Sequence, residues 1–237
     1  MRIVEPYARM LNPSSPVLDF YETDGIMMLR NVEYFARVSH RSEEKQTPDS
    51  WERFIRSVVL QHGDWSVTEH EKVSVEMVVD RGITHEIVRH RIGSYTQEST
   101  RFVNPIKRDG ECKFIRPADL PADGVEIVVE GGFVDPSSVW MSMMQLIENS
   151  YANLLRAGLA PQTARSVLPN ALASKIIITY NLRSWRHFFI MRTSAEAHPQ
   201  MRQVTIPLLR DFQERIPILY EDIEPGERQA EAMRKAR

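Results

Sequence analysis

The spacing of apolar residues along this chain predicts alternating helices and strands. Apolar residues that recur every three or four positions have the period of a helix with one buried face, and strict alternation has the period of a half-buried strand. We expect helices over residues 24–38, 49–60, 81–91, 136–157, 161–167, 182–192 and 199–214. We expect strands over residues 1–12, 72–79, 113–116 and 175–180.

Residues that favour helix ends support these boundaries. Thr23 or Asp24 is placed to cap one helix and Asn181 to cap another, while Gly63 and Gly158 stand where helices stop. In the longest helix, the residues expected to face the core are Val139, Trp140, Met143, Ile147, Tyr151, Leu154 and Leu155.

Two stretches have no clean period. Residues 92–101 are expected to form a loop, and residues 117–135, rich in Pro, Gly and Asp, an irregular insertion or lid. We find no internal repeat and no linker. The pattern therefore predicts a single α/β or α+β domain over residues 1–237, with a mixed or antiparallel sheet packed by long helices and a frayed tail at 226–237.

Composition limits the partners. The 30 Lys and Arg against 32 Asp and Glu give a formal net charge of −2, so no global field draws the chain to nucleic acid or to an anionic membrane. The one cysteine, Cys112, allows no intramolecular disulfide, and we interpret it as a small packed residue. No apolar run reaches the roughly 18 residues of a membrane span, and we expect a cytoplasmic protein.

The densest polar segment is 85–101. His85 and His90 resemble a zinc-protease pair, but five positions turn a helix by about 500°, so the rings cannot face one metal, and we expect no metal site. Taken by composition, the rest of the segment is either an anion site or a solvated helix end. Its cations and short polar side chains are Arg89, His90, Arg91, Ser94, Thr96, Gln97, Ser99, Thr100 and Arg101.

Two further clusters contain polar residues. In residues 162–192, Arg186 is interpreted as a solvent-exposed or salt-bridged residue, and the role of Arg183 is left open. In residues 62–70, Ser66 either donates a hydrogen bond to a ligand or belongs to a capped turn with Trp65 packed in the core.

Together these clusters resemble the flavin-dependent thymidylate synthases. That family is marked by Arg-His-Arg, seven residues, then Ser, which Arg89-His90-Arg91 and Ser99 match. The segments His62-Gly63 to His70, Ala164-Arg165 to Pro169 and Asn181 to Arg192 follow in family order. The resemblance covers roughly residues 30 to 205.

The resemblance implies an activity, cofactors and an assembly. Such enzymes methylate dUMP to dTMP with carbon from methylenetetrahydrofolate and a hydride that passes from NADPH through FAD. They are homotetramers whose active sites are shared between subunits.

It also implies site residues. Arg192 matches the arginine that favours the ionised N3 of uracil and is the expected catalytic residue, so no protein nucleophile is needed. The residues expected to contact FAD are Ser66, Arg89, His90, Arg91, Gln97, Asn181, Arg183 and His187. Those expected to contact the nucleotide are Glu86, Arg89, Gln97, Glu98, Ser99, Thr100, Arg101, Arg165 and Arg192, with Ser99 and Arg101 on its phosphate.

Three positions depart from the family pattern, and two other functions stay open. Asp64 stands where many members have His, Gln97 where many have Glu, and His187 where some have Asn. One alternative is a flavin-binding oxidoreductase that acts on another substrate. The other is a nucleic-acid-binding protein that uses arginines such as Arg89 and Arg101 on phosphates, which the nearly neutral charge disfavours.

Overall fold

The structure is a computed structural model, and it describes residues 1–12 and 25–226. The chain divides into two units, each built from separate segments. Unit 1 is Met1–Tyr7, Val78–Val88 and Gln97–Ile176, and unit 2 is Ala8–Met77, Arg89–Thr96 and Ile177–Arg237. The expectation of one domain over 1–237 stays a prediction. The expected cap at Thr23 or Asp24 and the tail after Gly226 lie outside the described residues.

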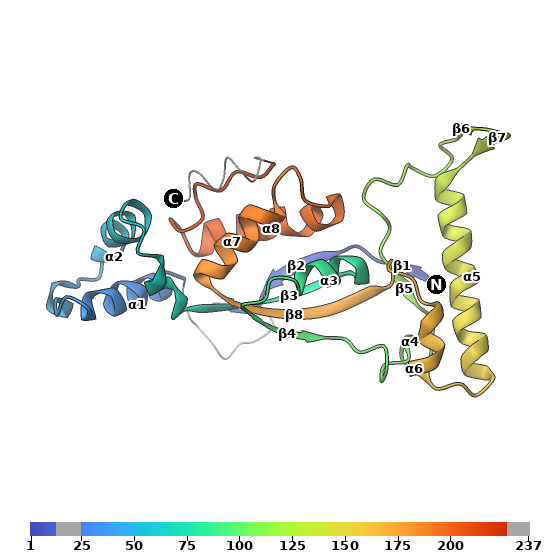
Figure 1. The fold of residues 1–237 in the computed structure, drawn as a ribbon, viewed down its shortest axis with the longest axis horizontal. Coiled ribbons are helices and arrows are strands. Elements are labelled where there is room, and N and C mark those ends of the chain that lie inside the picture. Colours follow the sequence, from blue (N-terminus) through green and yellow to red (C-terminus); the bar gives the residue numbers. More distant parts are fainter. Residues whose placement is uncertain (13–24, 227–237) are drawn as a thin grey trace. The chain divides into compact units, whose positions relative to one another are not determined.

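Four strands form a sheet in the order β2-β3-β8-β4 (Figure 1). They are β2 (Tyr7–Met10), β3 (Lys72–Asp80), β8 (Ala173–Asn181) and β4 (Ser94–Gln97). The expected strands 72–79 and 175–180 are confirmed by β3 and β8. The apolar alternation of β3 has its cause in burial, since Val73, Val75 and Met77 are fully buried.

The expected loop at 92–101 is wrong over residues 94–97, which form β4. This strand lies at the edge of the sheet, where Tyr95 and Gln97 are half-buried and the alternate residues are exposed. Polar residues suit such an edge, so no hydrophobic period reveals it. Gly93 precedes it because a Cβ there would stand 2.1 Å from the Tyr180 ring.

Unit 1 has its own core beneath a long helix. Strands β1 (Arg2–Ile3) and β5 (Lys113–Phe114) pair in parallel. The strand expected at 1–12 is divided into β1 and β2, and the strand expected at 113–116 is shorter, as β5. Cys112, Phe114 and Tyr151 are fully buried in this core. The helices of unit 1 are α3 (Arg81–Ile87), α4 (Pro105–Asp109), α5 (Pro136–Arg156) and α6 (Pro161–Ala164), the last continued by a 3₁₀ helix over Arg165–Val167.

Helix α5 is confirmed in its bounds and in most of its expected core face, which includes the buried Tyr151, but Val139 and Met143 do not belong to that face. Val139 and Met143 are 56% and 48% exposed, whereas Met144 and Glu148 are buried. The helix carries apolar side chains on two faces, and periodicity alone does not say which face meets the core. Trp140, Ile147, Leu154 and Leu155 do pack against the core as expected.

The expected irregular insertion at 117–135 contains an exposed hairpin. Strands β6 (Ile127–Val129) and β7 (Gly132–Val134) pair antiparallel at the N-terminal end of α5 (Figure 1). Gly131 and Gly132 make the turn at φ of 99° and 142°, values that favour glycine.

Unit 2 packs its helices around aromatic rings. Trp185 lies 5.1 Å from Phe212, and Phe212 lies 5.3 Å from Tyr220, between ring centroids. The expected cap of Asn181 is confirmed, since its Oδ1 accepts from the Ser184 N–H at 2.7 Å. Unit 2 contains α1 (Gly25–Val38), α2 (Ser50–Phe54) with a π-helix over Ile55–Gln61, 3₁₀ helices over Glu43–Lys45 and Trp65–Glu69, α7 (Leu182–Arg192) and α8 (Pro199–Arg215).

The helix expected over 81–91 ends earlier, at Ile87. Asp80 caps its start by accepting from the Ile83 N–H at 2.9 Å. Beyond its end, the His90 carbonyl accepts from the Tyr95 hydroxyl rather than from a helical N–H. No helix within residues 1–12 and 25–226 is long and apolar enough to cross a membrane.

Candidate active site

Several of the expected site residues fall into two clusters, one in each unit, and each cluster is described by itself. The unit 1 cluster surrounds residues 98–101, which follow the edge strand β4. The Arg101 N–H donates to Ser99 Oγ at 3.2 Å, and the Val103 N–H donates to the Ser99 carbonyl at 2.9 Å. These bonds fold 99–103 into a tight turn that presents Ser99 and Thr100.

Two guanidinium groups lie at this turn. Arg165 donates to Thr100 Oγ1 at 3.1 Å. Burial lowers the pKa of Arg81, and repulsion from Arg165 lowers it further, while Glu98 acts in the opposite direction. Arg81 Nη1 is buried and has no hydrogen-bond partner among the described residues. Positive charge thus gathers beside two hydroxyls, an arrangement that suits a phosphate dianion.

Sequence reasoning missed Arg81, although the sequence holds a signal for it. Arg81 is the first residue of α3, directly after the capping Asp80. The positive end of the helix dipole disfavours a cation there. A cation in that position therefore suggests a partner that the chain itself does not supply.

Gln97 is held by two hydroxyl groups within unit 1. Its Nε2 donates to Thr84 Oγ1 at 2.9 Å and to Ser174 Oγ at 3.1 Å. Thr84 Oγ1 in turn donates to the Arg81 carbonyl at 2.8 Å. Both Nε2 hydrogens are therefore used, and the Oε1 atom is what Gln97 can still offer to a ligand.

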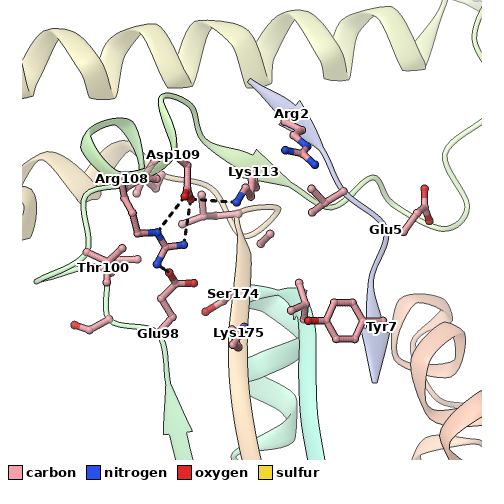
Figure 2. Close-up of a pocket in the computed structure, with 18 residues that line it drawn as sticks. Arg2, Glu5, Tyr7, Glu98, Thr100, Arg108, Asp109, Lys113, Ser174 and Lys175 are labelled. Atoms are coloured by element: carbon pink, nitrogen blue, oxygen red, sulfur yellow. Dashed lines mark hydrogen bonds and ion pairs between the residues drawn. The ribbon is translucent and has the colours of Figure 1, made fainter. Parts of the chain in front are cut away.

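A chain of ion pairs holds the Glu98 end of the turn. Glu98 pairs with Arg108 at 2.8 Å, Arg108 with Asp109 at 3.1 Å, and Lys113 with the same aspartate at 3.1 Å. Figure 2 shows this ladder along one side of a pocket of about 320 Å³, with Arg2, Tyr7 and Lys175 on other sides. The Glu98 N–H donates to the Lys175 carbonyl at 2.9 Å, which leaves the N–H groups of Ser99 and Thr100 as the backbone donors of the turn.

The unit 2 cluster joins three expected residues. Arg192 Nε donates to His90 Nε2 at 2.9 Å. The His90 ring lies 5.9 Å from the His187 ring and 5.0 Å from the Phe188 ring, between centroids. The Tyr95 hydroxyl, which holds the His90 carbonyl, lies 2.6 Å from the Tyr180 hydroxyl.

Both histidines of this cluster are uncharged at neutral pH. Burial lowers the pKa of His90 to about 4, and the charge of Arg192 and the neighbouring His187 add to this. Burial, then Arg192, also lowers the pKa of His187. Neutral imidazoles donate and accept hydrogen bonds, which suits the polar edge of an uncharged heterocycle.

The remaining expected residues have identifiable surroundings. Arg183 pairs with Glu69 at 2.6 Å, and both side chains are about half exposed. Ser66, Arg89 and Arg91 are exposed, and Glu86 is half-buried on α3. Their roles in a site stay predictions.

The interpretation of Arg186 as a salt-bridged residue is confirmed. It is buried, pairs with Asp222 at 2.5 Å, and lies 4.6 Å over the Trp65 ring. Trp65 is thus covered by a cation rather than fully enclosed in the core.

A family model and individual relatives of this chain all belong to the thymidylate synthases. The family model described as thymidylate synthase complementing protein matches residues 27–218. A flavin-dependent thymidylate synthase from Mycobacteroides abscessus is 32% identical over 201 residues, which is 81% of this chain and 78% of that protein. One from Mycobacterium avium has the same identity and coverage.

Two solved structures share the fold. A UMP/dUMP methylase from Streptomyces cacaoi bound with 5-Br dUMP superimposes with a TM-score of 0.69 at 20% identity, over 93% of this chain and 96% of that one. Thymidylate synthase X from Helicobacter pylori, with FAD and dUMP, superimposes with a TM-score of 0.68 at 18% identity, over 92% and 98%.

Proposed function

This chain belongs to the flavin-dependent thymidylate synthase family, and we propose that it methylates dUMP to dTMP with bound FAD. Methylenetetrahydrofolate supplies the carbon and NADPH the hydride. FAD, when bound, supplies the redox chemistry that carries this hydride.

The observation that carries the proposal is the unneutralised charge at the Ser99–Thr100 turn. A nucleotide phosphate would supply the partner that Arg81 Nη1 lacks among the described residues. Arg165, which is hydrogen-bonded to Thr100, and Arg101 would be the second and third cations around this phosphate. Arginine forks match phosphate oxygens in geometry as well as in charge.

The flavin side of the proposal rests on unit 2. Arg89 and Arg91 are exposed and can reach the pyrophosphate of a dinucleotide. The neutral His90 and His187 can hydrogen-bond the edge of the isoalloxazine ring, and we assign Ser66, Asn181 and Arg183 to the same cofactor.

Arg192 is the proposed catalytic residue. A guanidinium at the uracil edge stabilises the negative charge that develops as C5 becomes nucleophilic. The chain offers no cysteine for the alternative attack on the pyrimidine, because burial raises the pKa of Cys112 to about 12 and the residue packs in the unit 1 core. A thiol with such a pKa is not a thiolate at neutral pH.

We propose a homotetramer with shared active sites, in the cytoplasm. A second copy of this chain would cover the outer face of α5, where Val139, Met143 and Leu146 are about half exposed. The adjoining hairpin exposes Val128 and Phe133 by 75% and 69%. Such apolar patches mark association surfaces. Light scattering that finds a monomer at micromolar concentration would contradict this assembly.

The test begins with the absorption spectrum of the purified protein. We expect a yellow protein that releases FAD on denaturation and whose flavin spectrum shifts on addition of dUMP. With methylenetetrahydrofolate and NADPH it should form dTMP. A colourless protein that takes up no FAD contradicts the proposal, and salt-sensitive binding of single-stranded nucleic acid would favour the alternative. A flavoprotein whose spectrum ignores dUMP would favour an oxidoreductase with another substrate.

The phosphate assignment has its own control. Arg165→Gln should weaken dUMP binding, since it removes the cation that is hydrogen-bonded to Thr100. Arg56→Gln should leave dUMP binding unchanged, because Arg56 pairs with Glu221 and Glu52 on an exposed surface of unit 2. Equal dUMP affinity of the two variants would contradict the assignment.

A further inference from the structure

His90 is in contact with Arg192, the proposed catalytic residue. The Arg192 Nε–H donates to His90 Nε2 at 2.9 Å. A guanidinium can only donate, so Nε2 carries no proton, and a neutral imidazole must then carry its proton on Nδ1. The hydrogen bond fixes the tautomer of His90 and orients the Nε–H group of Arg192.

His90 is itself held at its backbone carbonyl and at its ring. The Tyr95 hydroxyl donates to its backbone carbonyl, and the Tyr180 hydroxyl lies 2.6 Å from that of Tyr95. The edge of the ring meets Phe188, which is fully buried one turn before Arg192 on α7. The contacts of His90 with its neighbours therefore fix the position of Nε2, the acceptor atom.

We propose that His90 is a positioning residue for Arg192, whose Nε–H it holds through Nε2 in the orientation needed at the uracil edge. This rests on the proposed function of the chain. Ordering a long arginine side chain costs conformational entropy at several rotatable bonds. A hydrogen bond from Nε–H to His90 offsets part of that cost before substrate binds. The gain falls on turnover, because the orientation matters where charge develops in the transition state.

Two variants that differ by one methylene group provide the test. In His90→Gln, the Oε1 atom can occupy the place of Nε2 and accept from Arg192, whereas the side chain in His90→Asn is too short to reach it. Their chemistry is otherwise the same. We expect His90→Asn to lower kcat per bound flavin by roughly 10- to 100-fold, the effect of losing a hydrogen bond to a charged group. We expect His90→Gln to recover most of that loss, with the dUMP KM of both variants changed far less than kcat.

A matched control separates positioning from stability. His40→Gln and His40→Asn change an exposed histidine in the turn that follows α1 and should leave kcat, KM and flavin content unchanged. Melting temperatures and FAD occupancy of all four variants are measured. If Gln and Asn at position 90 impair turnover equally, or if the loss lies wholly in FAD occupancy, the inference is wrong.

A measurement on the unaltered protein covers the case in which the variants do not fold. Nitrogen-15 shifts of labelled histidine should show His90 as the Nδ1–H tautomer at neutral pH. An Nε2–H tautomer would overturn the inference. Failure of the proposed function is distinct, because the unaltered protein would then form no dTMP.

Discussion

Replacement of Arg81 by methionine should make the ligand-free protein more stable and weaken its binding of dUMP. The guanidinium is unfavourable where it stands. It lies at the positive end of α3, is repelled by Arg165, and buries Nη1 without a hydrogen-bond partner among the described residues. A cation at the wrong end of a helix costs about 0.3–1 kcal/mol, and an unsatisfied buried donor about 1–3 kcal/mol.

Methionine keeps most of the packing of the arginine stem and removes both penalties. The backbone contacts are untouched, since the Arg81 N–H donates to the carbonyls of Asn170 and Leu172 at 2.8 and 3.1 Å. Loss of some contacts offsets part of the gain, and we expect about 1 kcal/mol of added stability. For a chain of this size that is about 2–4 °C in the melting temperature. The phosphate loses a charge-assisted hydrogen bond worth about 1.5–3 kcal/mol, or roughly 10- to 100-fold in dUMP affinity.

The assay is thermal melting with and without dUMP, together with titration of the flavin spectrum by dUMP. Arg56→Met is the control of opposite sign. Arg56 makes exposed ion pairs, so its loss should lower stability slightly, by at most about 1 kcal/mol, and leave dUMP affinity unchanged. Lower stability and unaltered dUMP affinity of Arg81→Met would contradict the placement of Arg81 on the phosphate.

Three further predictions concern individual side chains. Arg108→Gln breaks the exposed ion pair with Glu98 and should raise the dUMP KM by about 2- to 5-fold at unchanged flavin content; a KM equal to that of the unaltered protein would contradict a link to the turn. Cys112→Ala should keep turnover per flavin, and its loss with flavin intact would restore a role for the thiol. Because the folded-state pKa of His90 lies near 4, below the usual 6.5, protonation favours the unfolded chain. Urea unfolding should therefore show stability falling from pH 6.5 towards 4, with a weaker fall in His90→Gln.

Elements with a strong local signal were predictable from the sequence. Strand β3 was predictable because Val73, Val75, Met77 and Val79 alternate in the sequence within nine residues. Helix α7 begins where Asn181 caps it, a bond that spans three positions. Such features need no knowledge of distant segments.

The failures have a tertiary origin. Strand β4 is polar because it lies at a sheet edge, and its partner β8 is about eighty positions away. The limits of the core face of α5 are decided by what packs on the helix, since Val139 and Met144 are both apolar and only Met144 is buried. The apolar period of the sequence identified most of this face but does not decide between these two residues.

In the site, too, local features were predictable from the sequence and contacts between distant segments were not. The order of Arg89 to Arg101 in the sequence was enough to identify candidates, because the motif is local. The bonds that orient them join distant positions, such as His90 with Arg192 and Thr100 with Arg165. Sequence reasoning therefore identified several members of each cluster without the links between them.

Gln97 stands where many family members have Glu, and its hydrogen-bond partners explain why an amide suits this position. Thr84 has one hydroxyl hydrogen, and it is donated to the Arg81 carbonyl at 2.8 Å, so towards residue 97 the hydroxyl can only accept. The amide of Gln97 supplies the donor at 2.9 Å, whereas a carboxylate would place one acceptor against another.

Gln97→Glu should therefore lower stability by about 1–3 kcal/mol, the cost of a buried polar group without its partner. Because protonation of the introduced carboxylate would restore a donor, this loss should shrink as the pH falls below the pKa of that group. Urea unfolding of both proteins at several pH values measures it. A pH-independent difference, or no difference, would show that Thr84 can turn its hydroxyl towards residue 97, and that the amide is not required there.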